Sequence, residues 1–189
     1  MSKISPLAFI DPEAKIGENC EIGPFCFIDK NVEIGDNNVL MNSVSVLYGA
    51  RIGNGNVIFP GAVISAVPQD LKFQGEDTTA EVGDNNKIRE NVTINRGTAA
   101  KGKTCVGSGN LLMESVHVAH DAFVGNDCII GNGTKLAGEI IIDDHAIISA
   151  NVLMHQFCRV GGYTMVGGGT RFSQDIPPYT ICAREPVAY

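Results

Sequence analysis

The sequence predicts an all-β fold, a parallel β-helix whose short strands wind into stacked triangular coils. Three observations lead to this prediction: an aliphatic residue at every sixth position, a small residue two places before it, and in many repeats a glycine directly after it. Each observation accounts for one part of a coil, namely the strand, the narrow interior and the bend between strands.

The aliphatic repeat begins at Ile10 and keeps its six-residue phase as far as Val166. Of the 27 positions in this series, 24 are Ile, Leu, Val or Met, whereas a random arrangement would give about seven. In a helix, six residues advance by roughly 600°, so these side chains would point in three directions. Because six is a multiple of the strand period of two, short strands place them all on one face.

Small residues and glycines define the interior and the bends. The residue two places before the aliphatic is small or medium in the regular repeats except at Ile140, which predicts a narrow interior. Gly follows the aliphatic ten times and marks a bend after the strand. The simplest closed coil contains three hexapeptides, so residues 10–172 form about nine coils. Packing in the small inward position, rather than disulfides or metal binding, is predicted for four cysteines: Cys20, Cys26, Cys128 and Cys158.

Composition indicates a single domain over residues 1–189 and excludes several partners. The 189 residues are 44% hydrophobic and have a net charge of −7, without a block of Lys or Arg. We therefore expect neither nucleic acid nor a polybasic membrane contact. The sequence shows no secretory signal and no apolar run near the roughly 18 residues of a spanning helix. A cytoplasmic protein without stable membrane insertion is expected.

The repeat breaks in two places, and ligand-binding features are expected there, because a convex prism has no pocket of its own. Asp70 and Glu76 occupy positions where aliphatic residues belong, which predicts an extruded loop near residues 66–80 rather than one imperfect coil. A second, smaller loop is predicted near residues 96–103.

The histidines lie at places where the coil geometry allows a prediction. His117 falls between two inward valines and must point outward, while His120 lies at the following corner. One coil of three hexapeptides after His120 leads to Gly138, and a further coil leads to Gln156. We expect these three residues to stack along one edge, with His155 beside them.

This stack suits acyl transfer to a hydroxyl group. His120 can remove the proton as a general base, and the adjacent Asp121 can fix the imidazole tautomer and support its positive charge. The bare backbone N–H of Gly138 can receive the oxyanion. Spacing alone leaves open the alternative of a histidine on a polar corner without function.

Longer blocks of sequence resemble one family. The hexapeptide repeat resembles the hexapeptide-repeat acyltransferases, which implies a left-handed β-helix. Over nearly its whole length, the chain also resembles the family of UDP-N-acetylglucosamine O-acyltransferases, which opens lipid A biosynthesis. Six blocks carry this resemblance: QDLK at 69–72, RENVTINRGT at 89–98, HVAHD at 117–121, LAG at 136–138, HQF at 155–157 and QDIPPY at 174–179.

The resemblance implies transfer of an (R)-3-hydroxyacyl group from an acidic acyl carrier protein to the 3-hydroxyl of UDP-N-acetylglucosamine. It implies a homotrimer with active sites between subunits, and no metal or other cofactor. Position by position, it makes His120 the general base, Asp121 its partner and Gly138 the oxyanion N–H. Substrate contacts are implied for Asp70, Lys72, His117, Gln156 and, toward the acyl donor, His155. Gly168 resembles the position that limits acyl-chain length.

Two features depart from the family pattern. The family often has His after LAG, where this chain has Glu139, so the role of that residue is open. The family also continues beyond the position of Tyr189 into a mostly helical region that contacts the uridine, and we expect that region to be absent from this chain.

Other functions on the same repeat remain as alternatives. The N-acyltransferase of the same pathway has a separate N-terminal domain, whereas the repeats here begin at residue 10. A γ-type carbonic anhydrase, which is a zinc lyase, would need His117, His120 and a third histidine from a neighbour, and the three-residue spacing fits this poorly. A non-enzymatic β-solenoid would show a ladder of identical outward residues, and no such Thr ladder is present in the sequence.

Overall fold

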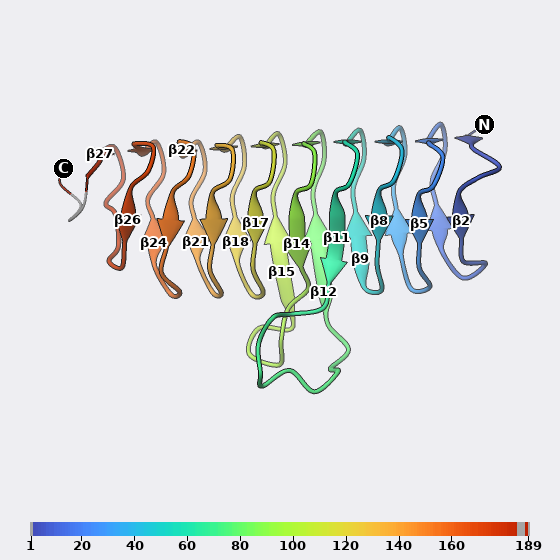
Figure 1. Ribbon diagram of the computed structural model, residues 1–189, viewed down its shortest axis with the longest axis horizontal. Helices are drawn as coiled ribbons and strands as arrows, with labels where there is room; N and C mark the ends of the chain where they lie inside the picture. Colours follow the sequence, from blue (N-terminus) through green and yellow to red (C-terminus); the bar gives the residue numbers. More distant parts are fainter. Residues whose placement is uncertain (1, 185–187, 189) are drawn as a thin grey trace.

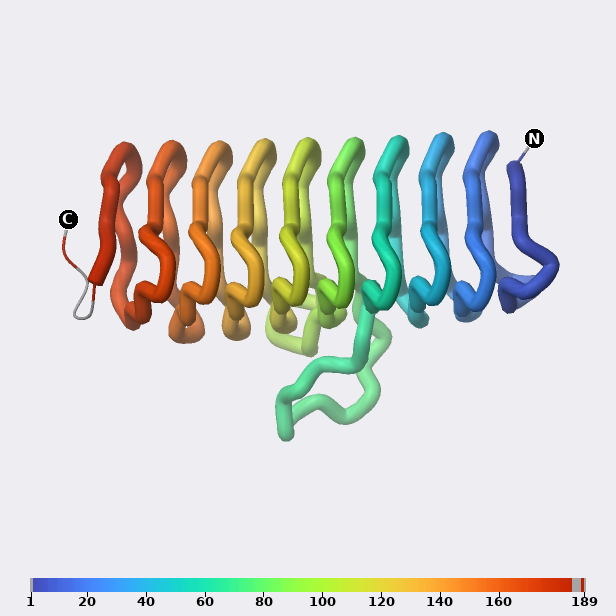
Figure 2. The backbone as a smooth tube through the Cα atoms, turned by 45° about the horizontal axis from the view of Figure 1, so that its top comes forward, coloured from blue at the N-terminus to red at the C-terminus, as the bar shows by residue number. Residues whose placement is uncertain are grey.

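The computed structural model describes residues 2–184 and 188 of the chain and shows a left-handed parallel β-helix (Figure 1). This part of the chain contains 27 short strands and no helix, and no helix within it could cross a membrane. Successive coils stack side by side from one terminus to the other (Figure 2). The predicted fold class is confirmed.

The strands form three parallel sheets. Sheet A contains β1 (Lys3–Ile4), β4 (Glu21–Ile22), β7 (Val39–Leu40), β10 (Val57–Ile58), β13 (Lys87–Ile88), β16 (Leu111–Leu112), β19 (Ile129–Ile130), β22 (Ile147–Ile148), β25 (Met165–Val166) and β27 (Ile181–Cys182). Sheet B contains β2 (Phe9–Ile10), β5 (Phe27–Ile28), β8 (Ser45–Val46), β11 (Val63–Ala66), β14 (Thr93–Asn95), β17 (His117–Val118), β20 (Lys135–Leu136), β23 (Leu153–Met154) and β26 (Arg171–Phe172). Sheet C contains β3 (Lys15–Ile16), β6 (Glu33–Ile34), β9 (Ala50–Ile52), β12 (Thr79–Val82), β15 (Lys103–Val106), β18 (Phe123–Val124), β21 (Ile141–Ile142) and β24 (Arg159–Val160).

The chain visits the sheets in the order A, B, C, so each coil has three corners. We call them the A–B, B–C and C–A corners, after the sheets that each turn connects. Strand register shows the coil length directly, since Ile22 pairs with Leu40, three hexapeptides later. Ile58 pairs with Ile88, five hexapeptides later, and Ile88 pairs with Leu112, four hexapeptides later. Two coils are thus longer than the rest by whole hexapeptides, so the inward pattern is kept across both insertions.

The core is the narrow interior that the sequence pattern predicts. Ile28, Ile58, Ile94 and Leu136 are all 0% exposed and belong to one continuous cluster along the prism. Burial of each such side chain contributes about 1.5–3 kcal/mol. All six cysteines are free thiols, and those predicted to face inward are buried.

Candidate active site

Both insertions emerge at the B–C corner. Residues 67–78 connect β11 to β12, and residues 96–102 connect β14 to β15; the two loops project from the same side of the stack (Figures 1 and 2). The longer loop begins at a β-bulge, where buried Ser65 has a left-handed φ of 67° and the register with β14 shifts. Both loops fall where the sequence repeat is broken.

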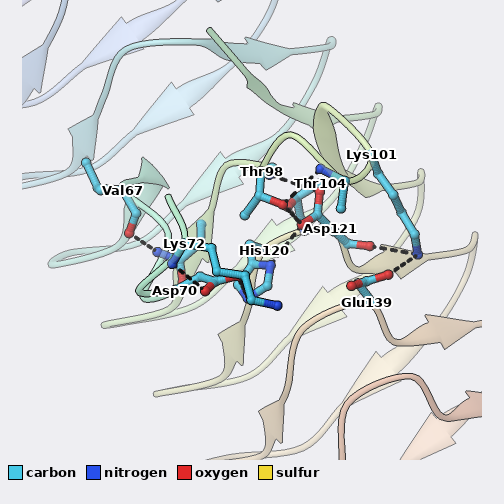
Figure 3. Close-up of polar contacts among 12 residues, drawn as sticks. Val67, Asp70, Lys72, Thr98, Lys101, Thr104, His120, Asp121 and Glu139 are labelled. Carbon is cyan, nitrogen blue, oxygen red and sulfur yellow. Dashed lines mark hydrogen bonds and ion pairs between the residues drawn. The ribbon is translucent and has the colours of Figure 1, made fainter. Parts of the chain in front are cut away.

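His120 and Asp121 lie in the B–C turn after β17. Asp121 is 1% exposed, and one of its carboxylate oxygens lies 2.8 Å from Nδ1 of His120 (Figure 3). The same carboxylate accepts hydrogen bonds from the backbone N–H of Thr98 at 2.9 Å and from its hydroxyl at 2.6 Å. The Asp121 backbone N–H donates to the Thr104 hydroxyl at 2.8 Å. Asp121 is therefore held from three sides, and it orients the imidazole with Nε2 facing outward from the pair.

The Asp121 carboxyl remains ionised although it is buried. Burial raises its pKa, but the hydrogen bonds from Thr98 and His120 together outweigh this effect and leave the pKa below its ordinary value. An ionised carboxylate at Nδ1 favours the tautomer with the proton on that nitrogen. Nε2 of His120 is then the basic nitrogen.

Gly138 lies on the same corner, as the addition of one coil to His120 predicts. The N–H of Glu139 donates to the His120 carbonyl at 3.0 Å, so the two turns are neighbours along the edge. A Cβ at position 138 would lie 2.7 Å from Cε1 and 2.8 Å from Nε2 of His120. Glycine is therefore required here because the imidazole fills the space of a side chain.

The Gly138 N–H is not used by the coil. Its place in the hexapeptide, two residues after the inward aliphatic, is occupied by proline in other turns, including Pro6, Pro12, Pro24 and Pro60, and proline has no N–H. Among the described residues, no acceptor takes the Gly138 N–H. A donor next to Nε2 of His120 is thus free for a substrate oxygen.

Asp70 approaches the histidine from the longer loop, and Lys72 follows it two residues later. Oδ2 of Asp70 lies 4.0 Å from Nε2 of His120, while its Oδ1 accepts the backbone N–H of Lys72 at 2.9 Å. Lys72 itself is exposed. The distance between Asp70 and His120 exceeds that of a direct hydrogen bond, and a substrate hydroxyl could contact both.

His117 points outward from β17, as predicted, and is half-buried. Its Nδ1 lies 2.7 Å from the Thr93 hydroxyl. Burial lowers the pKa of His117, and the positive charge of Lys135 lowers it further. His117 is consequently neutral at neutral pH.

Gln156 and His155 belong to the next coil. The N–H of Phe157 donates to the Gly138 carbonyl at 3.2 Å, which places both residues one step along the same corner. Both side chains are exposed, and Nδ1 of His155 lies 3.2 Å from the Gln156 carbonyl. Gly168 is different, because it follows β25 and belongs to the A–B corner. The chain by itself does not bring Gly168 to the His120 site.

Three contributors were not predicted from the sequence. Thr98, which holds Asp121, lies in a loop without periodicity, and Thr104 appears only as one more small inward residue. Nζ of Lys101 lies 3.4 Å from the Asp121 carbonyl oxygen and 3.9 Å from Oε2 of Glu139 (Figure 3). Glu139 thus pairs with the shorter loop. Thr98 ends the block RENVTINRGT, which carries no role for it in the sequence analysis, and the signal for Lys101 and Thr104 is their position within or directly after the second break.

Within residues 2–184 and 188, no three or more His, Cys, Asp or Glu side chains are grouped so that they could hold a metal ion. Nδ1 of His117 contacts Thr93, and Nδ1 of His120 contacts Asp121.

Known structures closely resemble this one, although no protein-family model matches the chain. LpxA, a UDP-N-acetylglucosamine acyltransferase from Bacteroides fragilis, is 74% identical with a TM-score of 0.97 over 98% of this chain and 73% of that one. LpxA from Acinetobacter baumannii is 40% identical with a TM-score of 0.96 over 98% and 72%. An Arabidopsis UDP-N-acetylglucosamine acyltransferase is 32% identical with a TM-score of 0.83 over 96% and 71%.

Proposed function

The chain belongs to the family of UDP-N-acetylglucosamine acyltransferases, and from this premise we propose that it transfers an (R)-3-hydroxyacyl group from an acyl carrier protein to the 3-hydroxyl of UDP-N-acetylglucosamine. This would be the first step of lipid A biosynthesis, carried out in the cytoplasm. The observation that supports the chemistry is the His120–Asp121 pair beside the unused N–H of Gly138.

Nε2 of His120 would take the proton from the sugar hydroxyl while the hydroxyl oxygen attacks the thioester carbonyl carbon. The carbonyl oxygen becomes negatively charged, and the Gly138 N–H would donate to it. When the tetrahedral intermediate collapses, the carbon–sulfur bond breaks and the carrier thiolate takes the proton from His120. Asp121 stabilises the imidazolium between these two transfers. Every step uses groups of this chain and of the two substrates, without a metal or other cofactor.

The acyl acceptor, UDP-N-acetylglucosamine, would lie between the two loops and the B–C corner. Asp70 and Lys72 would contact it from the longer loop, and His117 and Gln156 from the prism. His155, on the far side of Gly138, would contact the acyl donor. The exposed side chains of Gln156 and His155 are consistent with roles that require a bound substrate.

A homotrimer would complete this site. A convex corner leaves one side open to water, and a second prism around a threefold axis would supply the missing wall. Gly168, on the A–B corner, could then face the acyl chain from a neighbouring copy. Replacement of Gly168 by Met should shorten the preferred acyl chain, which donors of graded length would show; an unchanged preference would refute this assignment.

The decisive test is a radiolabelled transfer assay with UDP-N-acetylglucosamine and a 3-hydroxyacyl carrier protein. Wild-type protein should form labelled acylated sugar nucleotide, and His120→Ala should lose at least about 100-fold in rate. His155→Ala, on the same corner, provides a comparison that should weaken donor use without removing the base. Equal turnover by wild type and His120→Ala would overturn the mechanism.

A further inference from the structure

The position of loop 67–78 is not determined by the loop itself. It contains no strand or helix, and its Leu71 is 105% exposed. Its internal hydrogen bonds are short-range, such as the bond from the Phe73 N–H to the Asp70 carbonyl at 3.0 Å. The loop stands away from the coil stack (Figure 2). Asp70 therefore needs support from outside the loop to face His120.

That support comes from Arg96, at the base of the second loop. Its guanidinium carbon lies 5.2 Å from the ring centroid of Phe73 and 5.6 Å from that of Tyr48. Such distances allow cation–π attraction to both rings. Nε of Arg96 is buried without a hydrogen-bond partner, so aromatic contact rather than hydrogen bonding holds this atom in place. The hydroxyl of Tyr48 also donates to Asp77 of the loop at 3.1 Å.

Residues beside Arg96 hold both ends of the loop. The Arg96 N–H donates to the Ala66 carbonyl at 2.9 Å, and the Asn95 side-chain amide donates to the Val67 carbonyl at 2.7 Å. At the other end, the Thr78 hydroxyl donates to the Gly97 carbonyl at 2.6 Å. The backbone around Arg96 thus fixes where the loop begins and ends, which leaves its middle to be fixed by the Arg96 side chain.

We propose that Arg96, stacked between Tyr48 and Phe73, is a positioning residue that holds loop 67–78 so that Asp70 faces His120. Phe73 lies at the end of the turn that starts at Asp70, so fixing its ring fixes the direction of the Asp70 carboxylate. This inference rests on the proposed function in one respect, the role of Asp70 as a contact of UDP-N-acetylglucosamine. The arrangement of the loop can be tested without substrate.

The two consequences of losing Arg96 are separable. Asp121 is held by Thr98 and Thr104 through bonds that do not involve the Arg96 side chain, so the chemical step should persist. The acceptor, by contrast, would meet a loop with several conformations. A loss of positioning therefore raises KM for UDP-N-acetylglucosamine more than it lowers kcat.

The test compares Arg96→Met with Arg89→Met. Arg89 makes the same type of contact, 4.5 Å from the Phe59 ring centroid, but at the A–B corner. Arg96→Met should raise KM for UDP-N-acetylglucosamine about tenfold and change kcat by less than about threefold. Trypsin should also cut after Lys72 about tenfold faster than in wild type. Arg89→Met should leave KM, kcat and the cleavage rate unchanged.

Two further variants guard against an effect of misfolding. Phe73→Leu removes one ring from an exterior loop, so it cannot disturb the β-helix core, and it should shift KM and cleavage in the same direction. Arg96→Lys keeps the charge and should give a smaller shift. An unchanged cleavage rate in both Arg96→Met and Phe73→Leu would overturn the proposal. Faster cleavage with an unchanged KM would also overturn it. If the wild-type protein failed to acylate the sugar nucleotide, the proposed function would be overturned instead. The cleavage rates would then still decide whether Arg96 holds the loop.

Discussion

The C–A and B–C corners are built from the same hexapeptide but use polar groups in opposite ways. At the C–A corner, buried asparagines form a ladder inside the prism: the Asn56 side-chain amide donates to Asn38 Oδ1 at 3.0 Å, and that of Asn86 to Asn56 Oδ1 at 3.0 Å. The N–H of Asn110 continues the ladder to Asn86 Oδ1 at 2.8 Å. These polar groups are satisfied by their own neighbours, so the ladder needs no ligand.

At the B–C corner the polar groups are only partly satisfied from within. Asp121 receives bonds from Thr98 and His120, but the Gly138 N–H has no acceptor among the described residues, and the Asp70 carboxylate stays 4.0 Å from Nε2 of His120. Both insertions also occur at this corner. A corner that carries loops need not form all of its hydrogen bonds within each coil. The comparison indicates that polar groups whose hydrogen bonds are all formed within the protein support its stability. Polar groups with hydrogen bonds left to form, such as the Gly138 N–H, are available for a substrate.

The largest expected effect is that of Gly138→Ala at the B–C corner. The added methyl group would lie 2.7 Å from the His120 ring, and the imidazole, held by Asp121, would have to leave its position. The transfer rate should fall by about 100-fold or more, while the circular dichroism spectrum remains that of wild type.

Gly162→Ala is the matched variant at the C–A corner. Gly162 occupies the same place in its hexapeptide, and its nearest obstacle is the Asp144 carbonyl at 3.0 Å. This variant should keep the transfer rate within about twofold of wild type. Similar losses in both variants would mean that glycine serves the backbone alone, and the contrast between the corners would fail.

The two corners also differ in how far the sequence predicts them. One coil added to His120 gives Gly138, because strict periodicity fixes every regular turn. Lost periodicity also locates the loops, but it cannot give their conformation. Thr98 and Arg96 were therefore not assigned roles: their positions depend on contacts with Asp121 and Phe73 that no repeat encodes. The Asn38 side chain, in turn, looked like a small inward residue, since its ladder depends on side-chain torsions.

The next effect concerns stability at the C–A corner. Asn86→Ala would leave the buried N–H of Asn110 and the carbonyl of Gly107 without their partners. The free energy of unfolding should fall by about 2 kcal/mol, as measured by urea denaturation. The kcat at a temperature where the variant is folded should match that of wild type. A loss of kcat with unchanged stability would reverse the roles assigned to the two corners.

A smaller effect is expected for Thr98→Val. The substitution removes the hydroxyl that donates to Asp121 at 2.6 Å but keeps the backbone N–H bond at 2.9 Å. The kcat should fall about tenfold, since the carboxylate is less firmly held. Thr164→Val at the C–A corner, which removes a hydroxyl bond to the Pro177 carbonyl at 2.9 Å, should reduce thermal stability instead. If both variants lose only stability, Thr98 has no special link to the reaction.

The smallest expected effect is a pH dependence of the free energy of unfolding that comes from His117, on β17 next to the B–C corner. Burial and the nearby charge of Lys135 hold the pKa of His117 below its ordinary value of 6.5. As the pH falls below 6.5, His117 takes up a proton in the unfolded chain while it stays neutral in the folded chain. The free energy of unfolding therefore decreases as the pH falls, until the pH is below the pKa of His117 in the folded chain. His117→Gln should flatten this decline between about pH 7 and 5 by less than about 1 kcal/mol, as measured by urea denaturation at each pH. An identical slope in both proteins would show that His117 accepts its proton without cost to the fold.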